Sequence, residues 1–265
     1  MTTNSSTSTW PRFAAAGFFA AACQMAAPAA SLAQQAAPVQ GGPPGAAAAE
    51  TPAAPAGPTA MTTPALTGPL VANPNPFHLD IAPFFGPMYV TGAASVFGQV
   101  QTAPVKGADR TDNADISNAQ VALQTTEGIF QFFASPAAYN FPIVGVPFAH
   151  TGPTLKNTFG GVPVAWGKIV PTDTFNIQGG KLPTLIGAEY MFTFQNMNIQ
   201  RGLLWNQEPV VSRGVQANLT TGPVAWSLSG NDGFYSGDYN WISGAATWTI
   251  DPANSLVFTG AGPVS

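Results

Sequence analysis

Five charged residues lie in or beside one long connection in the second half of the chain. They are Lys181, Glu189, Arg201, Glu208 and Arg213. Acidic and basic side chains around a pore tune which charged solutes pass through it, so we interpret these residues as a candidate pore constriction. A second interpretation stays open, in which an arginine–carboxylate network only fastens the connection to the wall beside it.

The sequence offers no residue set that would support catalysis. Glu189 and Glu208 are two carboxylates, but nothing in the sequence fixes their separation, on which glycoside hydrolysis depends. The sequence contains no G-x-S-x-G elbow, P-loop, G-x-G-x-x-G fingerprint or H-E-x-x-H motif. We therefore expect that the protein is not an enzyme and uses no cofactor.

One stretch of the first long connection is rich in side-chain oxygens that could bind Ca²⁺. Its members are Asp109, Asp112, Asn113 and Asp115. The stretch lacks the spacing of an EF-hand loop and contains Arg110, so we interpret it as a solvated acidic loop. His78 and His150 are isolated and have no cysteine beside them to complete a zinc site. We therefore predict no metal site.

The segments around these residues have the pattern of β-strands. From Met88 onward we count about nine of them, most near the roughly 9 to 11 residues that a tilted strand needs to cross a membrane. Apolar and polar residues alternate along several strands, for example Val215 and Leu219 against Gln216 and Asn218. This alternation is typical of a wall with lipid on one side and water on the other.

The connections between these strands are alternately short and long. Tight turns are expected at Glu127-Gly128, Pro171 to Asp173, Thr221-Gly222 and Asp251 to Asn254, and long loops at 103–115, 139–161, 183–210 and 231–239. Outer-membrane barrels have short turns on the periplasmic side and long loops outside. The pattern predicts an all-β fold, an antiparallel up-and-down transmembrane β-barrel, with residues 183–210 folded into its lumen.

The first residues have the pattern of an export signal. Residues 1–33 contain one cation, Arg12, then an Ala/Phe-rich stretch and the cleavage sequence Ser31-Leu32-Ala33. An uncleaved anchor is an alternative, as is a lipoprotein anchor at Cys23. Cys23 is the only cysteine in the sequence, so removal of the signal would leave a chain without thiol chemistry.

Two further segments follow the expected signal. Residues 34–70 are rich in Ala and Pro, and the closely spaced prolines predict a disordered linker. Residues 71–265 are expected to form the barrel. Within this domain we place residues 71–87 at the entrance of the barrel or in its lumen.

The composition limits the class of protein and its partners. Only 8 % of the residues are charged, well below the roughly 25 % of soluble domains, and the net charge is −4. No basic stretch could neutralise phosphates, so we expect no nucleic-acid partner. After Ala33 no run of about 18 apolar residues could form a spanning helix. An uncharged polar composition also suits a secreted β-sandwich.

Several segments resemble a known family. They are 175–190 (FNIQGGKLPTLIGAEY), 196–209 (NMNIQRGLLWNQEP), 212–216 (SRGVQ), 231–235 (NDGFY) and 239–241 (YNW). Together they resemble the OmpL-like putative β-barrel porin family of Gram-negative bacteria, with a looser match back to Val90. The resemblance implies an outer-membrane barrel that passes small solutes, and it brings no catalytic residues.

The end of the sequence departs from this family. Its members are longer, and Ser255 to Ala261 is followed by Gly262-Pro263-Val264-Ser265 without a closing aromatic residue. Bacterial barrels close with an even number of strands, because an open edge in lipid leaves backbone groups unpaired. We therefore expect an incomplete barrel, truncated at its C-terminus.

These observations together predict a porin-like channel for passive diffusion of small hydrophilic solutes. Its expected location is the outer membrane of a Gram-negative cell, in contact with the lipid bilayer and lipopolysaccharide. A non-conducting barrel that acts as an anchor or adhesin is one alternative. A soluble periplasmic β-sandwich that binds saccharides is another, and assembly into a homo-oligomer stays open.

Overall fold

The computed structural model describes residues 77–82, 85–104, 106–107, 109–187, 189–196, 198–251 and 254–264. The expected signal peptide (1–33), the expected linker (34–70) and residues 71–76 lie outside this part of the chain.

The described residues form eleven strands and three short helical segments. The strands are β1 (His78–Ala82), β2 (Gly86–Val100), β3 (Asp112–Thr125), β4 (Phe130–Ser135), β5 (Ala137–Tyr139), β6 (Val164–Thr172), β7 (Phe175–Pro183), β8 (Val211–Thr221), β9 (Val224–Asn231), β10 (Trp241–Asp251) and β11 (Asn254–Pro263). The helical segments are α1 (Thr151–Asn157), η1 (Thr193–Gln195) and η2 (Leu203–Gln207). Within the described residues no helix is both long and apolar enough to span a bilayer.

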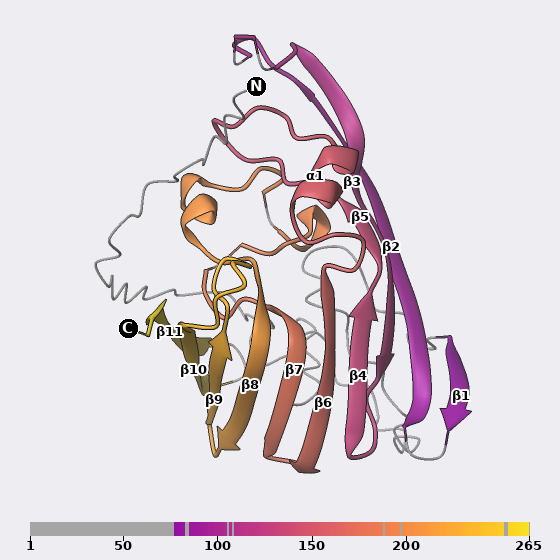
Figure 1. Ribbon diagram of the computed structural model, residues 1–265, viewed down its shortest axis with the longest axis vertical. Coiled ribbons are helices and arrows are strands. Elements are labelled where there is room, and N and C mark those ends of the chain that lie inside the picture. The colour runs from indigo at the N-terminus through magenta and orange to yellow at the C-terminus, as the bar shows by residue number, and fades with distance from the viewer. Residues whose placement is uncertain are drawn as a thin grey trace, which may run out of the picture.

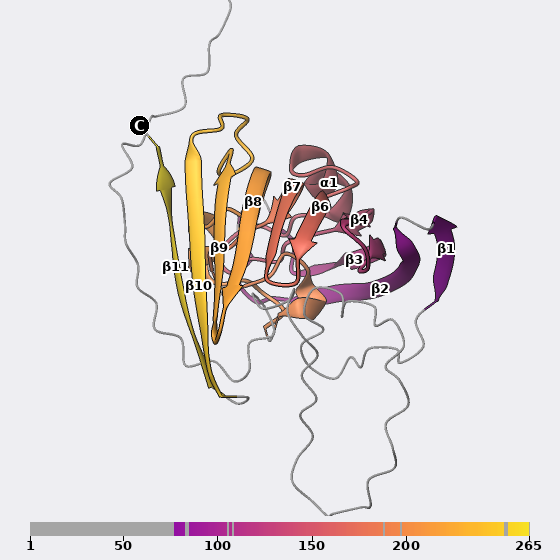
Figure 2. The same cartoon turned by 90° about the horizontal axis from the view of Figure 1, so that it is seen from below.

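The strands form one antiparallel up-and-down sheet. Their order is β1-β2-β3-β4-β6-β7-β8-β9-β10-β11, and β5 pairs with β3 beside this path. The sheet is strongly curved but not closed, because β1 and β11 lie apart at its two edges (Figure 2). The prediction of an all-β antiparallel fold is therefore confirmed.

The structure has more strands than the sequence predicted, for two local reasons. The segment between the predicted turn at Glu127-Gly128 and the predicted loop at 139–161 was counted as one strand, but the wall is interrupted at Pro136, which has no backbone N–H to donate to a ladder. His78–Ala82, expected at the entrance or in the lumen, is instead an edge strand paired with β2.

The two faces of the sheet differ in chemistry. Val215 and Leu228 point outward and are 57 % and 60 % exposed, whereas their neighbours Gln216 and Ser229 point to the concave face and are 6 % and 3 % exposed. The outward apolar side chains continue around the wall from β2 to β11. This confirms the predicted alternation, and we call the concave face the lumen face.

Tight turns and long loops lie at opposite ends of the sheet, as predicted (Figure 1). Gly128 and Gly222 have φ angles of +77° and +57°, which only glycine adopts without strain, and they allow the chain to reverse within a few residues. The loop after β5 carries α1, and the loop after β7 carries η1 and η2.

Strands β8 and β9 approach each other closely at Gly214. A Cβ at this position would lie 2.3 Å from the Gly230 carbonyl oxygen, whereas a Cβ at Gly230 would meet nothing within 4 Å. We expect Gly214→Ala to lower the free energy of unfolding by about 1–3 kcal/mol. Gly230→Ala is the matched control and should change it little. Urea titration of the detergent-refolded protein, followed by tryptophan fluorescence, measures both, and equal midpoints for the two variants would contradict the prediction.

Candidate functional site

One row of polar side chains crosses the lumen face from strand to strand. From β4 to β10 its members, paired in register, are Gln131, Lys168, Gln178, Gln216, Ser229 and Ser243. All except Gln131 are buried. We call this set the polar row. It presents amide and hydroxyl groups and one cation toward the lumen.

The side chains below the polar row hold one another in place. Gln216 Nε2 donates a hydrogen bond of 2.7 Å to Asn218 Oδ1, which also accepts one of 2.7 Å from Ser227 Oγ. Asn218 Nδ2 donates in turn to Asn176 Oδ1 at 2.8 Å. These bonds run across three neighbouring strands and fix the rotamers of the lumen face.

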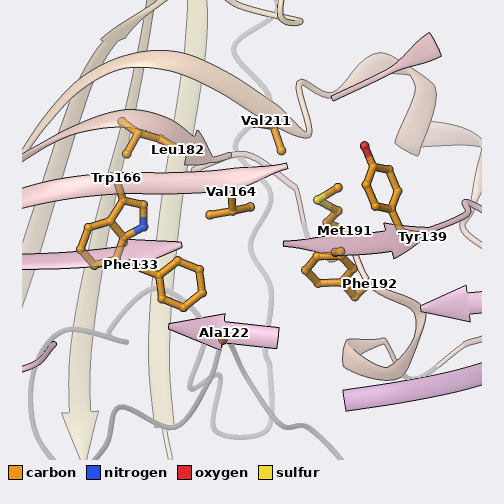
Figure 3. Close-up of a cluster of buried hydrophobic side chains, with 10 residues drawn as sticks. Ala122, Phe133, Tyr139, Val164, Trp166, Leu182, Met191, Phe192 and Val211 are labelled. Atoms are coloured by element: carbon orange, nitrogen blue, oxygen red, sulfur yellow. The ribbon is translucent and has the colours of Figure 1, made fainter. Parts of the chain in front are cut away.

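The loop at 184–210 packs onto the upper part of the lumen face. Met191 and Phe192 belong to one buried cluster with wall residues that include Phe133 and Trp166 (Figure 3). The rings of Phe133 and Trp166 stack with their centroids 5.6 Å apart. The segment with η1 and η2 lies inside the curve of the sheet (Figure 2). The apolar residues of this loop therefore anchor it inside the wall.

Arg201 is the polar centre of this loop and is fully buried. Its Nη1 donates to Thr193 Oγ1 at 2.8 Å and its Nη2 to the Met191 carbonyl oxygen at 2.6 Å. The guanidinium carbon lies 5.4 Å from the ring centre of Trp205 and 5.9 Å from that of Phe141. Burial lowers the pKa of Arg201 to about 10, a shift opposed by the nearby charge of Glu189, so the side chain stays protonated at neutral pH.

The backbone of Arg201 joins two long loops. Its N–H donates to the Pro142 carbonyl oxygen at 2.8 Å, and its carbonyl oxygen accepts from the Val144 N–H at 3.0 Å. Arg201 and Ile143 form an isolated parallel β-bridge. The loop after β5 and the loop after β7 are thus one hydrogen-bonded unit.

Two carboxylates lie close to each other on either side of η2. Glu189 accepts bonds of 2.9 and 3.0 Å from the Gly202 N–H, at the start of η2, and Glu208 follows the last residue of η2. Burial, and after it the negative charge of Glu189, raise the pKa of Glu208 above its ordinary value. The charged form of Glu208 is therefore disfavoured in the folded loop.

The other two candidate residues, Lys181 and Arg213, lie opposite each other on β7 and β8, near the loop end of the wall. Lys181 Nζ donates to the carbonyl oxygens of Phe159 and Val162, at 3.1 and 2.9 Å. Their parity along the strands is that of Ile177 and Val215, which point away from the lumen.

Arg213 has an acidic partner of its own. Its Nε donates to Asp232 Oδ2 at 2.7 Å, and its guanidinium lies 4.2 Å from the centre of the Tyr235 ring. Asp232 is buried and also accepts from the backbone N–H of Arg213 at 2.7 Å. This cluster ties the loop after β9 to the wall.

The five residues singled out in the sequence are therefore divided between two places. Glu189, Arg201 and Glu208 come together in the loop at 184–210, and Lys181 and Arg213 lie on the outer side of the wall. Arg201 fastens the loop from within, and a joint role of the five in a constriction stays a prediction.

Sequence reasoning missed Lys168, the cation of the polar row. The signal was available, because Lys168 has the parity of Trp166 in a strand whose exposed apolar residue is Ile169.

The acidic stretch at 109–115 fastens its own loop. Asp109 accepts from the Gln101 side chain at 2.7 Å and from the Asn113 side chain at 2.9 Å. Asp115 lies 3.0 Å from the His150 ring. No cluster of three or more potential metal ligands occurs among the described residues.

Comparison with known proteins gives one match. Residues 88–263 match the model of a family described as putative beta-barrel porin-2, OmpL-like. The matched segment covers β3 to β11 and nearly all of β2, and it includes both the polar row and the loop at 184–210. No curated protein and no solved structure matches the chain.

The buried guanidinium of Arg201 predicts a marked effect of its removal. Arg201→Ala leaves the Met191 carbonyl oxygen and the Thr193 hydroxyl without their donor and opens a cavity, so we expect a loss of about 2–4 kcal/mol in the free energy of unfolding. The loop should also become sensitive to chymotrypsin at Leu203 to Trp205. Arg110→Ala, which truncates an exposed arginine in another long loop, is the control. If the Arg201→Ala loop resists chymotrypsin as well as the wild-type loop does, Arg201 does not fasten the loop.

The raised pKa of Glu208 predicts that the loop is pH-sensitive. A carboxyl with a raised pKa in the folded state contributes stability that is present in acid and is lost as the pH rises through that pKa. Chymotrypsin should therefore cut the wild-type loop faster at about pH 8 than at about pH 5, after normalisation to its rate on an unfolded substrate at each pH. Asp238→Asn, which neutralises an exposed carboxylate and keeps Glu208, is the control and should show the same dependence. Glu208→Gln should flatten this dependence, and a profile identical to that of the wild type would refute the link to Glu208.

Proposed function

Because the chain belongs to the OmpL-like family of putative β-barrel porins, we propose that it is an outer-membrane channel for passive diffusion of small hydrophilic solutes. Such transport follows the solute gradient and requires neither a cofactor nor a catalytic group. What the channel requires is a wall that lipid accepts on one side and water on the other.

The single observation that carries this proposal is the two-sided wall. The polar row faces the lumen, and exposed apolar side chains such as Val96, Trp226 and Phe258 face outward, at 79 %, 49 % and 52 % exposure. A soluble β-sandwich buries its apolar side chains between two sheets and exposes its polar ones. This chain has the opposite arrangement, which favours the barrel over the sandwich.

The loop at 184–210 supports a channel with a narrowed lumen. Its Phe192 lies against Tyr139 of β5, with ring centroids 6.3 Å apart, and Arg201 holds the loop together by its bond to the Met191 carbonyl oxygen. An inward-folded loop reduces the cross-section open to solutes, so the proposed channel favours small ones. The carboxylates of Glu189 and Glu208 place acidic groups in the same loop.

The sheet has two open edges, and their pairing decides how the protein can be accommodated in a membrane. Within the described residues β1 pairs only with β2, and β11 only with β10. Unpaired backbone groups in lipid cost several kcal/mol each. We therefore propose that both edges pair with further strands in the membrane, from the same polypeptide or from a copy of it. In this setting the outward face contacts lipid and the loop end contacts lipopolysaccharide.

Liposome swelling tests the proposed transport. The protein should require detergent for extraction from outer membranes, and liposomes that contain it should swell in small neutral saccharides. Ser229→Trp, which fills the polar row, should slow the swelling severalfold, whereas Leu228→Trp, one residue away on the outward face, should not.

The other outcomes identify the alternatives. A detergent-extracted protein that leaves liposomes impermeable would indicate an anchor or adhesin. Release of the protein by osmotic shock would indicate a soluble periplasmic domain.

A further inference from the structure

Lys168 is a buried cation without an acidic partner. Its side chain is 7 % exposed, and its ammonium group forms no ion pair or hydrogen bond with any described residue. The nearest ring is that of Trp166, whose centre lies 5.4 Å from Nζ. A mostly buried cation is costly when no carboxylate compensates for its partial desolvation.

Lys168 lies in the polar row, on the lumen face of the sheet. It is the middle residue of β6, and its direct neighbours in the polar row are Gln131 on β4 and Gln178 on β7. Among the described strands, no other lysine or arginine has the lumen-facing parity, since Lys181 and Arg213 lie on the opposite parity. The positive charge therefore stands alone at the middle of the wall.

The surroundings of Lys168 suit an anion. Amide N–H₂ groups and hydroxyl groups of the polar row can donate hydrogen bonds to oxyanions, and an ammonium group attracts them from every direction. The acidic residues of the site, Glu189 and Glu208, belong to the loop and not to the polar row. An anion that passes the loop would meet a donor-rich belt with one unpaired cation.

We propose that Lys168 is the selectivity-determining residue of the lumen and that the polar row is a binding site for small hydrophilic anions. This inference rests on the proposed channel function. Lys168 is not one of the five candidate residues named from the sequence, which all lie in or beside the loop at 184–210. An unpaired charge in a polar lumen is tolerated because passing anions neutralise it in turn.

Ion selectivity in planar bilayers tests the proposal. With the full chain under a KCl gradient, Lys168→Gln should lower the permeability of chloride relative to potassium by about fifteenfold. A unit charge about 5 Å from an ion in water changes the partitioning of each ion about fourfold, and the changes for chloride and potassium have opposite signs. Lys168→Glu should lower it further, and the shift should shrink at about 1 M salt. Lys156→Gln makes the same change in net charge at an exposed site in the last turn of α1, and it should leave the ratio unchanged.

Chemical restoration of the charge separates selectivity from misfolding. Cys23 is the only cysteine, so Lys168→Cys in a Cys23→Ser background carries a single thiol. A cationic methanethiosulfonate reagent should restore the chloride preference of these channels, and an anionic one should lower it further.

Three results would overturn the proposal. A Lys168→Gln channel with unchanged selectivity would refute the role of Lys168 while the channel function stands. Thiol modification without effect on selectivity would refute the exposure of this site to passing ions. A wild-type protein that forms no channels would refute the proposed function, and this inference with it.

Discussion

The proposed membrane barrel depends on one constraint, which is that lipid offers no hydrogen-bond partner to a backbone N–H or C=O group. A strand in such a wall must pair on both sides, and the simplest way to do so is to pair with the strands before and after it in the chain. The order of the sheet follows this rule from β1 to β11, apart from the short β5. Antiparallel pairing then places the tight turns at one end and the long loops at the other.

A second consequence concerns the side chains, because each strand of such a wall is in contact with two solvents. Most outward positions hold apolar residues. Lumen positions hold amides and hydroxyls that bond to one another, such as Gln216 and Asn218, and apolar side chains such as Trp166 in the cluster that the loop at 184–210 joins. The buried polar groups of the loop at 184–210 also need hydrogen-bond partners, and they find some of them within the loop. Arg201 supplies donors to carbonyl oxygens that the loop would otherwise bury unpaired.

Much of the fold could be predicted from the sequence because two local signals were strong. Alternation with a period of two identified the strands around Gln216 and Ser229, and residues such as Gly128 and Gly222 marked the turns. Other features depend on contacts that no local pattern encodes. The split between β4 and β5 follows from Pro136, but α1 and the burial of Arg201 follow from packing between segments far apart in the sequence. For the same reason the charges around 181–213 were read as one group, although the structure separates Lys181 and Arg213 from Arg201.

The bonds between Arg201 and residues 142–144 have a consequence for the way the lumen opens. Because the two longest loops share these bonds, one loop can swing out alone only if the bonds break. In the proposed channel these two loops would therefore move together, and a single channel would switch between discrete current levels instead of widening gradually. The loops would also have to evolve together, since an insertion in one displaces the partner atoms of the other.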